Sequence, residues 1–267
     1  MNSEILKTMK LLTAVLVCAL CSLPALAADK SRELRMLEAA ENVEFLSQKI
    51  AKSYFYKQQG VRSDRAGEDL KRSLVLLEKD LIIIQNGIKK KDKEENNIAI
   101  FLDYTMGELK GLLLKPYSTE NGALIIDYSE SLLEGAEVIA QKHMHKKDAE
   151  EGMLVSVEHL LFLLERVNKL YIVYQAGFKD YNNVTQLQQA VQDFEIGLAK
   201  VNTYSKYSED ALEARNKVNE FWPVAKEFFV DIQKGSLPVI VLASVEKLEK
   251  ELMILEEFHH KKASRNK

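Results

Sequence analysis

The second half of this chain repeats the first half at an offset of 117 residues. The segment A-K-S-Y-F-Y-K-Q-Q-G-V, which contains Gly60, recurs as N-K-L-Y-I-V-Y-Q-A-G-F, which contains Gly177. The same offset pairs identical residues outside this segment: Met36 with Met153, Phe45 with Phe162, Leu70 with Leu187 and Glu78 with Glu195. A repeat of this length indicates two copies of one structural module.

Apolar side chains recur at steps of three and four residues in the first segment of each copy, which is the period of an amphipathic helix. In copy one they are Met36, Ala40, Val43, Leu46, Ile50 and Tyr54, and in copy two Met153, Val157, Leu160, Leu163, Val167 and Tyr171. Gly60 and Gly177 follow these stripes and suit the left-handed position after a helix.

Three further helices are predicted in each copy. The second helices begin near Ser63-Asp64 and near Asn182-Asn183, which are residues that cap helices. The third helices cover about 97–114 and 210–234, and Pro223 should kink the latter. The charged run at 89–95 is predicted to form an exposed turn, and the fourth helices match at an offset of 116.

The predicted fold class is therefore all-α, with two tandem antiparallel four-helix bundles. We expect copy one at 30–147, copy two at 148–262 and a polar tail at 263–267. The short join at 146–151 leaves two arrangements open. The bundles lie side by side, or they lie end to end and share a continuous helix.

Residues 1–27 have the pattern of a signal peptide. Lys7 and Lys10 precede an apolar run at 11–23, and Ala25-Leu26-Ala27 matches a cleavage signal. We expect cleavage after Ala27 and a periplasmic or secreted protein, with an uncleaved anchor as the alternative. Both cysteines lie in this segment, so the remaining chain has no thiol or disulfide chemistry. No later apolar run is long enough to span a membrane.

The segment N-V-E-F-L-S-Q-K-I-A-K at 42–52 resembles the first-helix signature of the PilJ-like domain, the periplasmic sensor region of type IV pilus methyl-accepting chemotaxis transducers. Nitrate and nitrite sensors use a related four-helix module. The resemblance implies a sensor that binds a ligand outside the cytoplasm. Glu44 stands where the nitrate sensors have their anion-contacting arginine, and Leu161 is its equivalent in copy two, so nitrate binding is not implied.

Polar and tyrosine side chains near this signature are the candidate contacts of a small organic ligand. The predicted ligand-binding residues are Glu44, Gln48, Lys49, Tyr54, Glu165, Arg166 and Tyr171. Core packing is the alternative for the tyrosines. A second apolar face on the first helix of copy two is predicted to form a contact between copies or subunits, unless it only widens the core stripe. This face consists of Leu154, Leu161, Leu164 and Ile172.

The sequence offers no assembled catalytic or cofactor chemistry. A metal is one interpretation of His143, His145, His259 and His260. Glu256-x-x-His259 has the spacing of a di-iron ligand pair, but such a site needs a second pair, so we predict solvated histidines and no metal.

The charge balance of 37 basic and 40 acidic residues gives no indication of nucleic-acid binding. We expect a non-enzymatic exported sensor or ligand-binding protein. Its partners would be a small-molecule ligand and an envelope or membrane-receptor protein. The alternative is a helical scaffold of the cell envelope without a small-molecule ligand.

Overall fold

The computed structural model describes residues 31–144, 149–233 and 235–265, and within these ranges every regular element is a helix. An N-terminal helix occupies 31–58. The following helices are α2 (Ser63–Gly87), α3 (Lys93–Leu113), α4 (Thr119–His143), α5 (Ala149–Gln175), α6 (Tyr181–Asn202), α7 (Glu209–Val230) and α8 (Pro238–Arg265). None of the helices in these ranges has the length and apolar character needed to cross a membrane. The predicted signal peptide lies outside the described residues.

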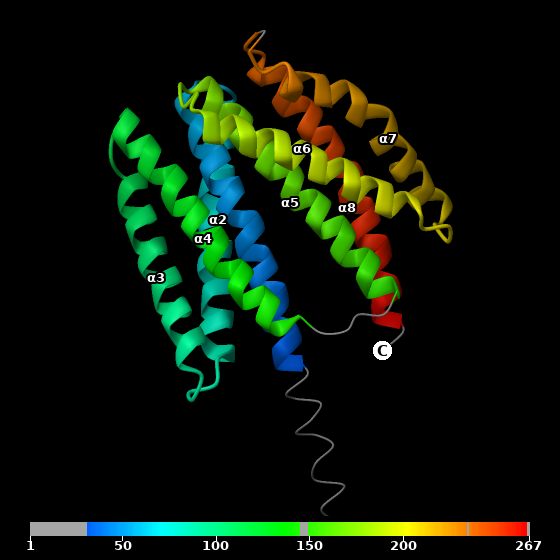
Figure 1. Ribbon diagram of the computed structural model, residues 1–267, viewed down its shortest axis with the longest axis horizontal. Helices are drawn as coiled ribbons and strands as arrows, with labels where there is room; N and C mark the ends of the chain where they lie inside the picture. The colour runs from blue at the N-terminus through cyan, green and yellow to red at the C-terminus, as the bar shows by residue number, and fades with distance from the viewer. Residues whose placement is uncertain (1–30, 145–148, 234, 266–267) are drawn as a thin grey trace, which may run out of the picture.

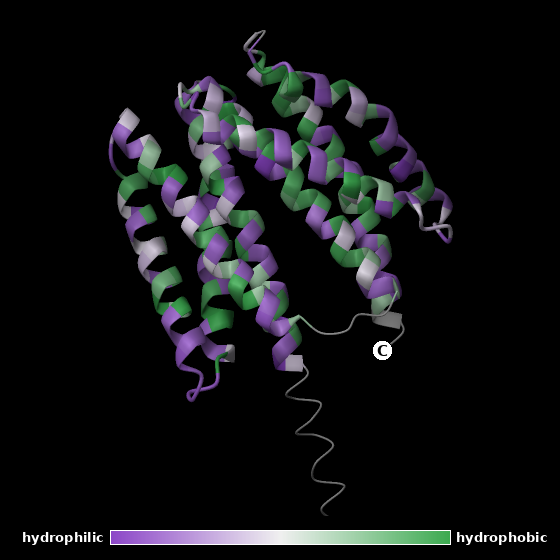
Figure 2. Cartoon of the chain, in the orientation of Figure 1, coloured by the Kyte–Doolittle hydropathy of each residue, from purple (hydrophilic) through white to green (hydrophobic). Residues whose placement is uncertain are grey.

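The helices form two groups, which we call the first half (31–144) and the second half (149–265). In the first half α3 packs on both α2 and α4, and in the second half α5 packs on α6 and α8 while α7 packs on α8. Figure 1 shows the two groups beside each other, with α3 and α7 on opposite outer sides of the molecule. Apolar positions recur along every helix next to hydrophilic ones, as Figure 2 shows.

Two glycines end the N-terminal helix and α5 in the same way. Gly60 has a φ of 72° and Gly177 a φ of 108°, which are left-handed conformations. The N–H of Val61 donates to the carbonyl of Tyr56, and the N–H of Phe178 donates to the carbonyl of Val173. These bonds satisfy carbonyls that the helix end leaves unpaired. The predicted capping role of both glycines is confirmed.

The next helices begin close to the predicted positions, but their capping residues differ from the prediction. Arg62, in a left-handed conformation and without a side-chain cap, precedes α2, so Ser63 and Asp64 do not cap it. Asp180 caps α6 by accepting a hydrogen bond from the N–H of Asn183 at 3.0 Å. An aspartate two residues earlier thus supplies the acceptor expected from the asparagines.

The charged run at 89–95 is not wholly an exposed turn. Asp92 accepts a hydrogen bond from the N–H of Glu95 at 3.1 Å and starts α3 at Lys93. Glu95 is buried in the first turn of this helix. The prediction failed for the end of the run because an aspartate cap and acidic residues stabilise a helix N-terminus.

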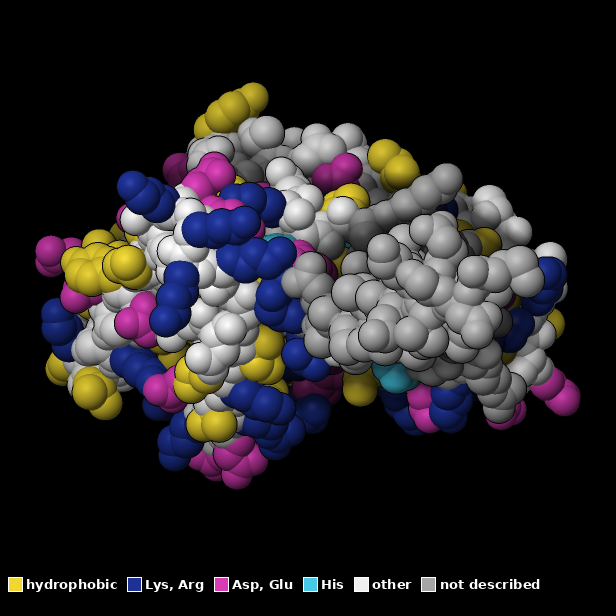
Figure 3. All heavy atoms as spheres, turned by 90° about the horizontal axis from the view of Figure 1, so that it is seen from below, with side chains coloured by type: hydrophobic (Ala, Val, Ile, Leu, Met, Phe, Trp, Pro, Cys, Tyr) yellow, Lys and Arg dark blue, Asp and Glu magenta, His cyan; other side chains and the backbone are white. Residues whose placement is uncertain are grey.

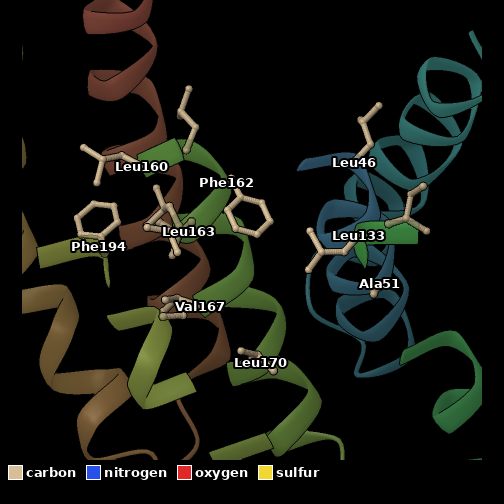
Figure 4. Packing of buried hydrophobic residues seen from close by; sticks show 14 of the residues in the cluster. Leu46, Ala51, Leu133, Leu160, Phe162, Leu163, Val167, Leu170 and Phe194 are labelled. Atoms are coloured by element: carbon tan, nitrogen blue, oxygen red, sulfur yellow. The ribbon is translucent and has the colours of Figure 1, made fainter. Parts of the chain in front are cut away.

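Buried apolar side chains of both halves form one connected cluster. α5 lies at its centre, since almost every residue from Leu160 to Tyr174 is buried. Figure 4 shows Leu160 and Leu163 near Phe194 of α6, while Phe162 points toward the side that carries Leu46. A helix that is apolar on most sides packs on more than one neighbour.

The two halves lie side by side. Lys52 donates to Glu165 at 2.8 Å and Tyr56 donates to Asn168 at 2.6 Å, which places the N-terminal helix beside α5. Met144, at the end of α4, has an extended backbone with a ψ of 125°, so α4 does not continue through it. The end-to-end alternative with one shared helix does not fit this geometry.

Candidate binding cleft between the two halves

A cleft of about 780 Å³ lies between the first and second halves, at the end where the N-terminal helix and α5 begin. Its walls come from these two helices, from the last turns of α4 and from the second part of α8. In Figure 1 this is the lower end of the molecule, where the first half faces α5 and α8. Four helices from both halves therefore share one hollow.

The lining combines apolar walls with many carboxylates. The larger apolar side chains are Leu34, Leu37, Phe45, Met144, Leu154, Val155, Leu161, Phe162 and Met253. The acidic ones are Glu38, Glu41, Glu44, Glu137, Glu151, Glu158, Glu249 and Glu256. Among the described residues that line the cleft, Lys49 is the single lysine, and there is no arginine. Figure 3, which views the molecule from below, shows both basic and acidic side chains on the described part of this end.

Glu44 is the most perturbed carboxyl group of this cleft. Burial, and then the nearby carboxylates of Glu137 and Glu41, raise its pKa to about 8. Burial also raises the pKa values of Glu137 and Glu256. Within the described residues the Glu44 carboxyl group forms no ion pair. Desolvation and like charges both disfavour the ionised form, which explains the direction of these shifts.

The N-terminal helix and α5 also carry a polar network along their contact, which we call the seam network. Its first part surrounds Glu165, which accepts a hydrogen bond from Lys52 at 2.8 Å and lies 3.7 Å from Lys49. Lys49 also donates to Glu249 of α8 at 3.0 Å. Burial alone would lower the pKa of Lys49, but Glu165 and Glu249 outweigh it and raise the value.

The second part of the seam network surrounds Glu130 of α4. Arg166 donates to Glu130 at 3.0 Å and to Gln48 at 3.2 Å, and Lys169 donates to Glu130 from a fully buried position. Burial lowers the pKa of Lys169. Although burial opposes it, the charges of Lys169 and Arg166 lower the pKa of Glu130. Each of these buried ions has a partner, as burial of charge requires.

Gln48, Lys49, Glu165 and Arg166 thus lie together in the seam network, whereas Glu44 and Lys49 line the cleft. The two predicted tyrosines lie elsewhere. Tyr54 packs on Phe55, and the hydroxyl of Tyr171 accepts a hydrogen bond from the N–H of Leu237 at 2.9 Å. A role in ligand binding stays a prediction for all of these residues.

The four leucine and isoleucine residues of the predicted second face separate into two pairs. Leu154 and Leu161 line the cleft. Leu164 and Ile172 are fully buried within the connected core.

Sequence reasoning missed Lys52, Lys169, Glu130 and Glu249 as members of the seam network. A signal existed for the lysines, because they are identical at the repeat offset and stand beside apolar stripes. Glu130 is also identical to its repeat partner, Glu246, at the offset of 116, whereas Glu249 has Leu133 as its counterpart and gave no such signal. Glu130 and Glu249 come from α4 and α8, and only the packing of these helices brings them to the seam.

The predicted solvated state of the histidines is wrong for His143 and His259, which are both buried. His143 contacts Glu33, and His259 lies 3.5 Å from Glu150. Both contacts join the last part of the fourth helix to the beginning of the first helix in the same half. The packing of these helix ends removes the rings from water. His260 lines the cleft, and His145 lies outside the described residues.

No group of three or more potential ligand side chains is arranged for a metal ion in the part of the chain that the structure describes. No family model, curated protein or solved structure matches this chain. The similarity of residues 42–52 to the PilJ-like signature therefore stays a prediction from sequence. The cleft and the seam network are the two features of the molecule whose geometry bears on its function.

Proposed function

We propose that this chain is a non-enzymatic, exported ligand-binding or sensor protein that holds a small organic molecule in the cleft between its halves. The observation that carries this proposal is the cleft itself. Its volume of about 780 Å³ lies within the range of roughly 300–1,000 Å³ that is common for small-molecule sites. The apolar walls of the cleft are also typical of such sites.

We also propose that the halves are duplicated four-helix modules arranged as a pseudo-dimer. Gly60 and Gly177 support this, because they cap equivalent helices at the repeat offset. The pairs Glu33–His143 and Glu150–His259 support it further, since they join the same two helix ends in each half.

A ligand in this cleft would contact both halves at once. Its binding would favour one separation of the halves over another if it contacts them better in that arrangement. We propose that a partner protein of the cell envelope reads this change, in the manner that the PilJ-like resemblance implies.

A scaffold function without a ligand is the second candidate. It is favoured by apolar side chains that are exposed on α3, where Ile100 is 68% exposed and Tyr104 62% exposed. A partner that covers these side chains would need no cleft. The two functions differ in whether filling the cleft has a consequence.

Blocking the cleft tests the proposal. Val155→Trp places a large ring on the cleft wall, while Val75→Trp places the same ring on the exposed surface of α2. With the uncharged dye Nile red as probe, we expect bound fluorescence to fall several-fold in Val155→Trp and to stay unchanged in Val75→Trp. Equal dye binding by both variants and the unsubstituted protein would contradict a ligand cleft.

A further inference from the structure

We propose that the ligand of the cleft is an organic cation with an apolar body, whose ammonium group lies beside Glu44 and whose body lies between Phe45 and Phe162. This inference rests on the proposed function and names the chemical class of its ligand.

The first argument is the charge of the lining. Eight glutamates face one lysine among the described lining residues. That lysine, Lys49, is already held by Glu249 at 3.0 Å and by Glu165 at 3.7 Å. An anionic ligand would therefore find no uncommitted lysine or arginine in this lining, and it would meet several carboxylates at short range.

The second argument is the position of Glu44. Its carboxyl group forms no ion pair within the described residues and lies near Glu137 of the facing helix α4. A ligand ammonium group beside Glu44 would stabilise the ionised form of this carboxyl group, which would release its proton when the amine binds. Charge-assisted hydrogen bonds of this kind are shorter and stronger than neutral ones.

The third argument is the apolar wall. Phe45 from the first half and Phe162 from the second half occupy equivalent positions of the repeat, and both line the cleft. The ring of Phe45 already has a cation beside it, since Lys49 Nζ lies 5.0 Å from its centroid. Aromatic rings attract cations in this way, and they also cover an apolar body.

These features also separate the proposal from other cations. A bare metal ion would use a small part of about 780 Å³, and the described residues contain no group arranged for a metal. A polyamine would satisfy the carboxylates but leave the apolar walls exposed. An amine that carries an apolar group matches both parts of the lining.

Isothermal titration of the full chain with four matched probes tests this inference. 4-Phenylbutylamine, 4-phenylbutanol and 4-phenylbutyrate share one apolar body and differ in charge, and spermidine is a cation without that body. We expect the amine to bind at least tenfold more tightly than the alcohol and than spermidine, and we expect no binding of the carboxylate.

Variants locate the cation. Glu44→Gln should weaken amine binding about tenfold and leave the alcohol unaffected, and Glu137→Gln should act in the same direction. Glu227→Gln, on the exposed surface of α7, is the matched control and should change nothing. Circular dichroism checks that each variant is folded.

The outcomes separate the two proposals. Binding of the alcohol or the carboxylate as tightly as the amine would overturn the cation inference and leave a ligand cleft in place. Spermidine binding as tightly as 4-phenylbutylamine would contradict the inference that the ligand carries an apolar body. Absence of binding by all four probes, together with an unchanged dye signal in Val155→Trp, would overturn both proposals.

Discussion

The seam network and the cleft occupy the same boundary between the two halves, but they treat charge in opposite ways. In the seam network every buried ion has a partner, as Lys52 has with Glu165 and Lys169 has with Glu130. In the cleft, carboxylates gather around one lysine, and Glu44 has no counterion among the described residues. The buried ions of the seam network are paired, whereas the described lining of the cleft holds more glutamates than basic side chains.

This difference indicates separate roles for the two regions. A paired network that is removed from water fixes the register of the helices that carry it, because any shift would leave a buried ion without its partner. A cleft whose described lining holds eight glutamates and one lysine, and in which Glu44 forms no ion pair with a described residue, gains most from an added cation. We therefore interpret the seam network as the structural contact between the halves and the cleft as the site that binds and releases a ligand.

The largest expected effect comes from breaking the seam network. Lys52→Met leaves Glu165 almost fully buried, with Lys49 3.7 Å away as its remaining cation. We expect a loss of roughly 3 kcal/mol in the free energy of unfolding, because an uncompensated buried charge is costly. Urea denaturation at neutral pH measures this change.

A double variant and a surface control complete that experiment. Lys52→Met with Glu165→Leu should recover most of the loss, since both charges are then removed. Lys261→Met, which breaks the exposed pair with Glu257 in α8, should leave the free energy of unfolding almost unchanged. A loss from Lys52→Met as small as that of Lys261→Met would contradict the structural role of the seam network.

A smaller effect is expected at the border between the two regions. Leu161 lines the cleft and is 8% exposed, so Leu161→Asp places a carboxylate in a largely apolar contact that already faces glutamates. We expect a loss of about 2 kcal/mol and a weaker association of the halves.

The matched control is Leu212→Asp on α7, where the leucine is 39% exposed. It should cost less than about 0.5 kcal/mol. Thermal denaturation compares the two variants. Equal stability would show that Leu161 does not contribute to the contact between the halves.

The helical content of this chain could be predicted because each helix carries its own periodic stripe, and the end of the first helix in each half could be predicted because Gly60 and Gly177 act locally. The capping residues at the helix starts were harder to predict. Asp180 and Asp92 compete with neighbouring polar residues for the capping position, and the sequence does not rank them.

The polar contacts between the halves could be predicted only in part. Gln48 and Arg166 were singled out as candidate ligand contacts, and the structure brings them together across the seam. The acidic character of the cleft was not predictable, because its glutamates come from four helices and only tertiary packing brings them to one hollow. The burial of His143 has the same origin, since its partner Glu33 lies 110 residues earlier in the sequence and only tertiary packing brings the two together.

The smallest of the three expected effects concerns the cleft and is seen in the pH dependence of the free energy of unfolding. Burial and the carboxylates of Glu137 and Glu41 raise the pKa of Glu44 from 4.5 to about 8, so the folded protein keeps a proton that the unfolded chain loses within this window. Stability therefore falls as pH rises from about 4.5 to about 8. Besides those two glutamates, the charged groups that line the same cleft are Lys49, Glu38, Glu151, Glu158, Glu249 and Glu256, together with the titratable His159 and His260.

Glu44→Gln removes this contribution without changing the shape of the side chain. We expect the variant to exceed the unsubstituted protein by about 1–2 kcal/mol in unfolding free energy at pH 8.5 and to equal it near pH 4.5, a difference discounted for the partial exposure of Glu44. Urea denaturation across this range measures both slopes, with Glu227→Gln as the exposed control. The pKa values of Glu137 and Glu256 are also raised. The stability of the variant should therefore still fall with rising pH, but with a shallower slope than that of the unsubstituted protein. Identical slopes in both proteins would mean that Glu44 is solvated or has a counterion, and the charge difference between cleft and seam network would then lose its main support.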